Sequence, residues 1–435
     1  MASTLSTRRL IGGSYTVDVT CGLVAHSDGL SSRIFRCPLS SSASFPFSPT
    51  TPSSSSYLPE LSALGLAAER AGGVGGWICI KRVHTDDEPR PHSIRREVAL
   101  LTTLSDDNIV PLLAAFLDTS DPFGEFIDLV MPLYAATLED VLIEPSLLRL
   151  PSPACEGVQR AGESIQQLWQ ESPEGFAHSV AVQMLSGLAF LHGKEVAHRD
   201  VKPPNVLIAH TGAVRLCDLG TAFSASHCVD EGQKMVCQVG TGIFRAPELL
   251  FSPSHYDPYA IDVWAAAVTL AHFYTALIRI PTTRAKVAEV DERTSWQRAF
   301  DSNTTPPSPG SDELVFWEEE PPMPQQTASG YIRTPLFEPD RGDIGLAASI
   351  FSLLGLPTDA KHWPEAEHFH PPLHRLPFTP TRAKGISSAL PLATDPNPLV
   401  EHLIIPALHL SASHRPTATQ LLHSLQSQHT PRTLK

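Results

Sequence analysis

The sequence predicts an α+β chain in which a small lobe built on an antiparallel sheet precedes a larger helical lobe. Strand patterns occur in the first third of the chain, and helical patterns dominate the remainder. Three segments rich in proline and polar residues interrupt these patterns at residues 38–59, 144–174 and 282–330. They contain too little apolar surface to offset the entropy of ordering, so we expect them to be mobile insertions.

The first third contains three clear elements. Residues 77–83 (W-I-C-I-K-R-V) and 126–131 (F-I-D-L-V-M) are short apolar runs that predict strands, and Pro132 marks a turn after the second. Residues 94–104 between them show helical spacing. Beyond the second insertion, apolar side chains recur at helical spacing over residues 180–191, 261–274 and 399–410.

These patterns define the expected domain limits. We expect an N-terminal extension at residues 1–14, a small lobe at 15–134, a large lobe at 135–425 and a tail at 426–435.

Composition limits the class of partner. The chain has 46 acidic and 32 basic side chains, a net charge of -14, which disfavours nucleic acid as a partner. Its 7 cysteines form no C-x-x-C pair, as expected for reduced thiols. No apolar run approaches the roughly 18 residues of a membrane span, and no signal-peptide core follows the N-terminus. We therefore expect no membrane association and a cytoplasmic or nuclear location.

The strongest chemical signal is H-R-D-V-K-P-P-N at residues 198–205. Asp200 can accept the proton of an attacking hydroxyl, Asn205 can hold Mg²⁺, and Lys202 can offset charge that develops on a transferred phosphate. Asp218 of D-L-G follows 13 residues after Asn205, beyond the strand-like run 214–217, and can chelate the same metal. A-P-E at residues 246–248 would close the activation segment.

In order and spacing these motifs resemble the signature set of the eukaryotic protein-kinase superfamily. The resemblance covers about residues 15–425 outside the insertions. It implies a bilobal kinase fold, ATP and Mg²⁺ as cofactors, and transfer to serine or threonine of a protein substrate, the last because of Lys202. It also implies that Asp262 anchors the catalytic loop and that Arg415 pairs with Glu248.

The same resemblance assigns the nucleotide site. Lys81 of I-C-I-K matches the lysine that pairs with ATP phosphates, and Glu97 matches the helical glutamate that holds this lysine. Met131 would lie at the back of the adenine pocket. The remaining assigned positions are the backbone groups of Pro132 and Tyr134 at the adenine edge, Cys79 over the ring, and Ile34 and Leu207.

The phosphate-covering loop departs from the family pattern. Ser27, Gly29 and Ser32 occupy the three glycine positions, so only the central glycine remains, and we expect a raised ATP Michaelis constant. An inactive pseudokinase and a scaffold acting through the insertions are therefore alternatives. The retention of all five core residues argues against both: Lys81, Glu97, Asp200, Asn205 and Asp218.

Several stretches resemble the cyclin-dependent and mitogen-activated branch. Residues 91–97 (P-H-S-I-R-R-E) resemble its P-S-T-A-I-R-E helix, Arg245 precedes A-P-E, and residues 336–357 with Trp363-Pro364 resemble its insert. Within the branch, residues 15–24, 33–36 and 241–251 are most similar to the single-subunit cyclin-dependent-kinase-activating kinases of fungi.

The activation segment carries a further expectation. Val236 stands where cyclin-dependent kinases carry a phosphothreonine, and Phe223 replaces one of three phosphate-binding arginines, the others being Arg96 and Arg199. We therefore expect activity without phosphorylation of this segment.

We expect the chain to act as a monomer whose substrate is a cyclin-dependent kinase. A cyclin-like subunit is possible but not required. The alternative is a divergent cyclin-dependent or mitogen-activated kinase that acts on Ser/Thr-Pro sites with a regulatory subunit. Arg245 favours the proline preference, and Gly240, in place of the usual valine, disfavours it.

Overall fold

The computed structural model describes most of the chain in two compact units, Met1–Ala276 with Arg333–Lys435, and Leu277–Ile332. The described residues are 6–10, 13–17, 24–28, 32–38, 47–49, 61–75, 77–119, 124–143, 156–226, 234–279, 331–338, 340–356, 362–372, 375 and 378–428. Gly29 of the predicted phosphate-covering loop lies outside them.

An eight-stranded sheet forms the small lobe, in the order β3-β4-β6-β8-β7-β1-β2-β5 with antiparallel neighbours throughout. Its strands are β1 (Ser6–Leu10), β2 (Gly13–Val17), β3 (Val24–Asp28), β4 (Ser32–Pro38), β5 (Phe47–Pro49), β6 (Trp77–His84), β7 (Ala114–Asp118) and β8 (Phe126–Pro132). The predicted strands at 77–83 and 126–131 are therefore confirmed. The sheet also includes β1 and β2, which begin within the expected N-terminal extension.

The side chains on the two faces of β6 differ in burial. Ile78 and Ile80 are buried on one face, whereas Cys79 and Lys81 on the other are only partly buried. Cross-strand partners share a face of a sheet. Ile34 lies opposite Lys81, and Met131 lies opposite Cys79, so these four side chains belong to one face.

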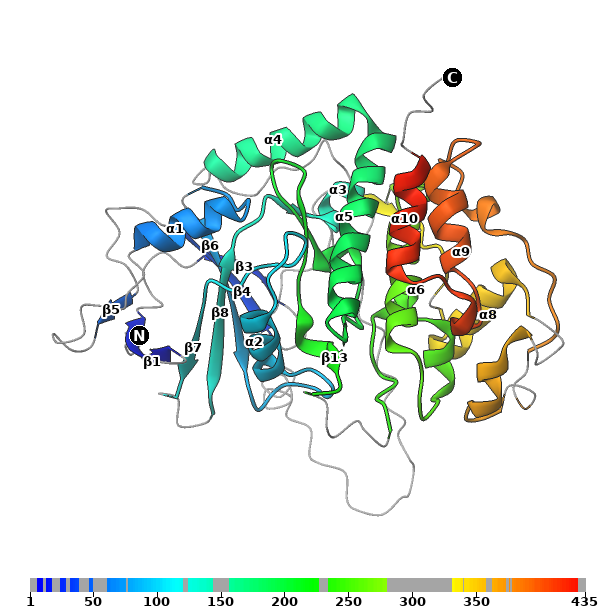
Figure 1. Cartoon of the computed structure of the whole chain (residues 1–435), viewed down its shortest axis with the longest axis horizontal. Helices are drawn as coiled ribbons and strands as arrows, with labels where there is room; N and C mark the ends of the chain where they lie inside the picture. The colour runs from blue at the N-terminus through cyan, green and yellow to red at the C-terminus, as the bar shows by residue number, and fades with distance from the viewer. Residues whose placement is uncertain are drawn as a thin grey trace, which may run out of the picture. The chain divides into compact units, whose positions relative to one another are not determined.

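Two helices accompany the sheet (Figure 1). The helix predicted at 94–104 is confirmed as α2 (Ile94–Thr103), which begins where Ser93 Oγ accepts a hydrogen bond from Arg96 N at 3.3 Å. Such an N-cap contributes about 1 kcal/mol. Helix α1 (Leu61–Arg70) was not predicted. It packs beside β6 and β8, and its Ala68 is buried against Ile78 and Ile80.

The large lobe is mainly helical, as expected. Its helices are α3 (Leu138–Ile143), α4 (Glu156–Glu171), α5 (Pro173–Gly193), α6 (Pro258–Ala271), α8 (Gly342–Leu354), α9 (Ile405–Ala407) and α10 (Ala418–Gln428). Every residue of α6 from Ala260 to Ala271 is buried, which makes α6 a central helix of the core. Its N-terminus is capped by Asp257, which accepts from the backbone N–H groups of Tyr259 and Ala260, at 2.9 and 3.1 Å.

The segments between the helices of the large lobe contain short strands and 3-10 turns. A three-stranded sheet joins β9 (Ala136–Thr137), β11 (Val206–Ile208) and β12 (Val214–Leu216), and β10 (Val196–Ala197) pairs with β13 (Phe223–Ser224). Strands β14 (Leu277–Arg279) and β15 (Tyr331–Arg333) form a pair of their own. The strand-like run predicted at 214–217 is therefore confirmed.

Two sequence expectations were wrong in part. Residues 156–171 and 173–174 of the predicted mobile insertion are helical. Helix α4 buries Ile165 completely and stacks Trp169 on Phe273, with 5.7 Å between ring centroids. Residues 399–410 do not form one regular helix: Val400–Ile404 is a π-helix, followed by the short α9 that contains Pro406. Over the described part of the chain, no helix is both long and apolar enough to span a bilayer.

Candidate active site

Three side chains from three elements meet at the amino group of Lys81. Lys81 Nζ on β6 lies 2.7 Å from Glu97 Oε2 on α2 and 2.7 Å from Oδ1 of Asp218, a residue that follows β12. Asp218 has a φ of +66°, a left-handed conformation that aspartate residues adopt more readily than most. It directly precedes the 3-10 turn Leu219–Thr221. The structure thus brings together three of the predicted residues, which lie up to 137 positions apart.

The charges of this cluster depend on one another. Burial by itself disfavours the charged form of Lys81, yet the carboxylates of Asp218 and Glu97 outweigh it and raise the pKa of Lys81. Burial likewise opposes ionisation of Asp218, but the Lys81 ammonium group holds the pKa of Asp218 well below its usual range. Both groups are therefore charged at neutral pH.

The catalytic loop is held by one buried carboxylate. Asp262 on α6 accepts hydrogen bonds from the backbone N–H groups of His198 and Arg199, each at 2.7 Å, and from His192 Nε2 at 3.0 Å. Asp262 is completely buried, and Arg199 has a φ of +65°. The anchoring role expected for Asp262 is confirmed. An unusual backbone conformation persists where the surrounding structure fixes it in this way.

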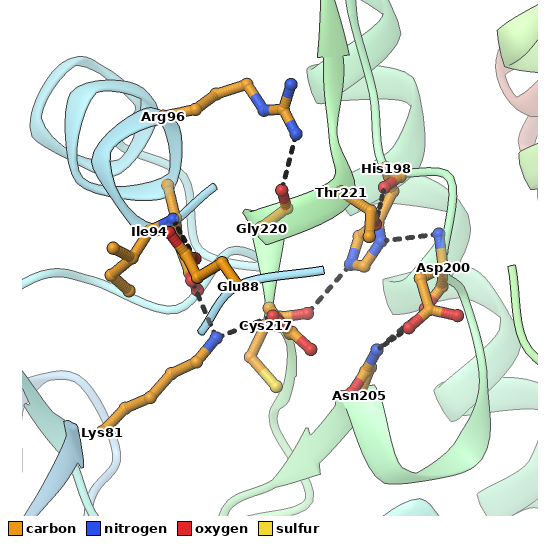
Figure 2. Close-up of polar contacts among 12 residues, drawn as sticks. Lys81, Glu88, Ile94, Arg96, His198, Asp200, Asn205, Cys217, Gly220 and Thr221 are labelled. Atoms are coloured by element: carbon orange, nitrogen blue, oxygen red, sulfur yellow. Dashed lines mark hydrogen bonds and ion pairs between the residues drawn. The ribbon is translucent and has the colours of Figure 1, made fainter. Parts of the chain in front are cut away.

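The ring of His198 connects this loop to the backbone of Cys217, directly before Asp218. His198 Nδ1 accepts from Asp200 N at 3.3 Å, so His198 Nε2 carries the proton and donates to Cys217 O at 2.9 Å (Figure 2). The tautomer is assigned from these contacts. Asp200 and Asp218 are thereby held relative to each other through one imidazole.

Asp200 is surrounded by three donors. Asn205 Nδ2 donates to Asp200 O at 2.8 Å and to Asp200 Oδ2 at 3.2 Å, and Lys202 Nζ lies 2.9 Å from Asp200 Oδ2. Thr241 Oγ1 donates to Asp200 Oδ1 at 2.7 Å and accepts from Lys202 Nζ at 2.8 Å. The predicted residues Asp200, Lys202 and Asn205 therefore lie within one hydrogen-bonded group.

The donor set fits Mg²⁺. Within the described ranges no group of three or more His, Cys, Asp or Glu side chains could hold an ion. Mg²⁺ does not need such a group, since it is usually bound by one or two carboxylates together with substrate phosphates. Asp218 supplies an ionised carboxylate, and Asn205 donates through Nδ2 so that its oxygen is the atom suited to a metal.

The predicted adenine-site residues fall on four strands that belong to two sheets. Ile34, Cys79 and Met131 share the β6 face of Lys81, while Leu207 lies on β11 in the large lobe and is partly buried. Burial raises the pKa of Cys79 to about 12 and raises the pKa of Cys217 as well. Both thiols are therefore neutral.

The other predicted positions are placed as follows. Ser27 pairs with Ile34 beside a bulge between Ala25 and Ser27, and Ser32 pairs with Val83. The phenol of Tyr134 donates to Ala71 O at 3.1 Å.

Helix α2 is bound directly to the D-L-G turn. Gly220 O accepts from Ser93 N at 2.9 Å. It also accepts from Arg96 Nη2 at 2.7 Å (Figure 2). Arg96 also donates to Pro91 O, and Ile94 N donates to Glu88 Oε1 at 2.6 Å. The helix that carries Glu97 is thus fixed to the turn that carries Asp218.

Side-chain and backbone contacts anchor the described parts of the activation segment. Arg199 Nε donates to Thr221 O at 2.7 Å, and its guanidinium lies 5.5 Å from the ring centroid of Phe223. Arg199 Nη1 also donates to Tyr256 OH at 3.2 Å, and this hydroxyl donates to Val236 O at 2.7 Å. The buried thiol of Cys237 donates to Pro253 O at 2.9 Å.

The end of the segment is tied to the helical lobe. Arg415 donates from Nη1 and Nη2 to the two carboxylate oxygens of Glu248, each at 2.7 Å, which confirms the predicted pair. Arg245 Nε donates to Val239 O at 3.3 Å, and Gly240 adopts a φ of +73°.

Sequence reasoning missed two members of the site. Thr241 bonds to both Asp200 and Lys202, although only its position five residues before A-P-E could have indicated it. His192 binds Asp262, and nothing in its local sequence distinguishes it from other helical histidines.

Comparisons with known proteins agree with this geometry. The profile of the family described as protein kinase domain matches residues 73–425. Cyclin-dependent kinase D-1 of Arabidopsis thaliana is 30% identical over 228 residues, which cover 52% of this chain and 48% of that protein. A probable serine/threonine-protein kinase MRK1 homolog of Encephalitozoon cuniculi is 29% identical over 197 residues, covering 45% of this chain and 52% of that protein. The chain therefore spans about half the length of these curated relatives.

A solved structure shares the fold. A chain from the yeast RNA Pol II CTD kinase CTDK-1 complex superposes with a TM-score of 0.51 at 17% identity, covering 82% of this chain and 88% of that chain. At this identity the likeness shows the fold alone.

Proposed function

Because this chain belongs to the protein kinase domain family, we propose that it is a serine/threonine kinase of the cyclin-dependent-like branch that transfers the γ-phosphoryl group of Mg-ATP. The observation that carries the proposal is the pair of 2.7 Å contacts from Lys81 Nζ to Glu97 and Asp218, beside the Asp200 group. A pseudokinase, which transfers no phosphate, would not need to keep both of these contacts.

Each residue has a distinct part in the transfer. Asp200 accepts the proton of the substrate hydroxyl and orients it, while Lys202 and Thr241 keep this carboxylate in place. Lys81, positioned by Glu97, binds phosphate oxygens. Asp218 and Asn205 would hold Mg²⁺, which neutralises charge on the phosphates when bound. Ile34, Cys79, Met131 and Leu207 would enclose the adenine.

A transfer assay tests this proposal. The purified chain should label a generic Ser/Thr peptide or protein with Mg-ATP, and chelation of Mg²⁺ or Asp218→Ala should abolish the labelling. Asp107→Ala is a matched control, because it removes an exposed carboxylate to which the proposed mechanism assigns no part. Labelling that survives in Asp218→Ala would exclude the mechanism, and a wild-type chain that transfers nothing would favour the pseudokinase.

For the substrate we propose the activation-segment threonine of a cyclin-dependent kinase, phosphorylated by a monomer. Two features support this. Arg96 and Arg199, which match phosphate-binding arginines, donate instead to Gly220 O and Thr221 O, and Val236 offers no phosphoacceptor. In addition, the outer side of α2 is polar: Arg95 is exposed and pairs with Glu125. An apolar interface with a cyclin is not expected on such a side.

The alternative remains a divergent cyclin-dependent or mitogen-activated kinase that acts on Ser/Thr-Pro sites with a regulatory subunit. The names of relatives such as Cyclin-dependent kinase D-1 favour it. For either substrate we propose a cytoplasmic or nuclear location.

One experiment separates the two. The chain is incubated with Mg-ATP and a catalytically dead cyclin-dependent kinase, and the Thr→Ala form of that kinase's activation loop serves as control. Phosphate on the intact loop alone supports the activating role. Strong labelling of Ser/Thr-Pro peptides without labelling of the loop supports the alternative.

A further inference from the structure

One backbone oxygen joins three parts of the molecule. The carbonyl of Ala71, which directly follows α1, accepts a hydrogen bond from Tyr134 OH at 3.1 Å and another from Arg215 Nη2 at 3.2 Å. Tyr134 lies in the segment that connects the two lobes, and Arg215 lies on β12 of the large lobe. The loop after α1 is therefore bound both to the connecting segment and to the large lobe.

The next residues of this loop are pressed against the connecting segment. Val74 N donates to Leu133 O at 2.7 Å. A Cβ atom added to Gly73 would lie 2.8 Å from Pro132 Cβ and 2.9 Å from Ala68 O, so the loop approaches as closely as glycine permits. A Cβ atom added to Gly72, whose φ is +83°, would lie 3.2 Å from Ala209 Cβ in the large lobe.

The residues on either side of this loop are themselves buried in the two lobes. On the small-lobe side, α1 is anchored by Ala68, which is 1% exposed and packs with Ile78, Ile80, Phe116 and Val130 of the sheet. On the large-lobe side, Arg215 is buried and also donates to Asp106 O at 3.2 Å. Burial also raises the pKa of the Tyr134 phenol to about 12, so it stays protonated and able to donate.

We propose that residues 71–74, the hinge brace, are a positioning element that fixes the backbone of Pro132 and Tyr134 and thereby sets the affinity for ATP. This inference rests on the proposed function, in which those backbone groups face the adenine edge. Lobes joined by a short segment move about that segment, and a binding site tolerates displacements of only about 0.5 Å. The contacts of the hinge brace are with the connecting segment and the large lobe, so we expect it to act on the nucleotide site through the connecting segment.

Gly73→Ala tests the hinge brace, and Gly193→Ala is its matched control because a Cβ atom there meets nothing within 4 Å. We expect the Michaelis constant for ATP to rise about tenfold in Gly73→Ala, since the added methyl group must displace Pro132 or break the Val74 contact. The Michaelis constant for peptide should change less than about twofold. Gly193→Ala should match the wild type in both constants.

Tyr134→Phe provides a second variant, which keeps the backbone and removes the hydroxyl group that bonds to Ala71 O and interacts with Arg215. It should raise the Michaelis constant for ATP by about 3- to 10-fold. In both variants, hydrogen exchange of residues 131–137 should accelerate in the absence of nucleotide, while exchange of α6 stays as in the wild type.

The outcomes separate this inference from the proposed function. If the wild type transfers phosphate but Gly73→Ala and Tyr134→Phe behave like Gly193→Ala, the hinge brace has no positioning role. The inference also fails if both Michaelis constants and the exchange of α6 rise together, because that result indicates general destabilisation. A wild type without transfer or ATP binding overturns the proposed function, and the exchange data alone then decide whether the brace holds the connecting segment.

Discussion

The catalytic loop and the Lys81 cluster are fixed in different ways. The loop is held inside the large lobe, where Asp262 binds two backbone N–H groups and His192. The Lys81 cluster is held by ion pairs between side chains, and its members come from β6, α2 and the segment after β12. One region is complete within a single lobe, whereas the other exists only while the two lobes meet.

This difference indicates where control of the proposed phosphoryl transfer can act. Ion pairs between elements that move relative to each other can be made and broken, while backbone bonds to a buried carboxylate last as long as the fold does. The activation segment mostly resembles the catalytic loop in this respect, because its contacts at Thr221, Cys237 and Val236 lie within the large lobe. Only its start, at Gly220, is bonded to α2 among the contacts described above. Four predictions break or sharpen this comparison.

The largest effect is expected for Asp200→Asn. The amide keeps the size of the side chain but cannot accept the substrate proton, so kcat should fall by about 10³-fold or more with ATP affinity retained. Radiolabel transfer at saturating ATP measures the loss, and thermal unfolding checks the fold. Retention of more than about a tenth of the wild-type kcat would contradict the role of Asp200.

Asp262→Ala and Glu97→Gln should separate stability from activity. Asp262→Ala leaves two buried N–H groups without an acceptor and should lower the free energy of unfolding by about 3 kcal/mol. Glu97→Gln keeps an acceptor for Lys81 but removes the charge, so transfer should fall by about 10- to 100-fold with a change of less than about 1 kcal/mol in unfolding. Denaturant titration and kinetics measure both quantities. Equal destabilisation by the two variants would remove the distinction drawn above.

His272 should make the large lobe sensitive to acid. It is buried, its Nδ1 contacts Val268 O, and its ring lies 5.5 Å from that of Phe244 in the activation segment. Burial, with Arg333 nearby, lowers the pKa of His272 from 6.5 to about 4, even though the Val268 contact opposes this. Between these values the unfolded state binds the proton and the folded state does not, so stability is lost as pH falls from 6.5 to about 4.

Between pH 7 and pH 5 this residue should cost about 2 kcal/mol of unfolding free energy. Urea titrations of the wild type and His272→Gln at both pH values measure it, since the variant should lose that much less on acidification. Equal losses in the two proteins would show that His272 does not titrate between them.

The smallest effect is expected for removal of phosphate. Because Arg199 and Val236 are both bonded to the Tyr256 hydroxyl, and a valine cannot be phosphorylated, phosphatase treatment should change transfer by less than about twofold. Intact mass before and after treatment shows whether phosphate was present and removed. Loss of activity after removal of the phosphate would show that the activation segment, like the Lys81 cluster, depends on contacts that can be made and broken.

Elements with a strong local pattern were predictable from the sequence. β6, β8 and α2 were placed within a residue or two, because an apolar strand or an N-capped amphipathic helix is encoded by neighbouring side chains. Helix α4 was missed because its proline-containing surroundings suggested disorder, and its stability comes from packing of Trp169 on Phe273, a distant residue. Helix α1 was missed for the same reason, since Ala68 becomes informative only once Ile78 and Ile80 lie beside it.

For the site, the sequence by itself determined the residues and the chemistry of the catalytic loop. Asp200, Lys202 and Asn205 lie within six positions, so their proximity follows from covalent connection. Only the tertiary structure decided which distant groups join them. Thr241 reaches Asp200 across 41 positions, Asp218 reaches Lys81 across 137, and Ala71 O accepts from Arg215 across 144. Local sequence encodes propensity and donor type, whereas contacts at such separations form only when burial of the shared core brings the segments together.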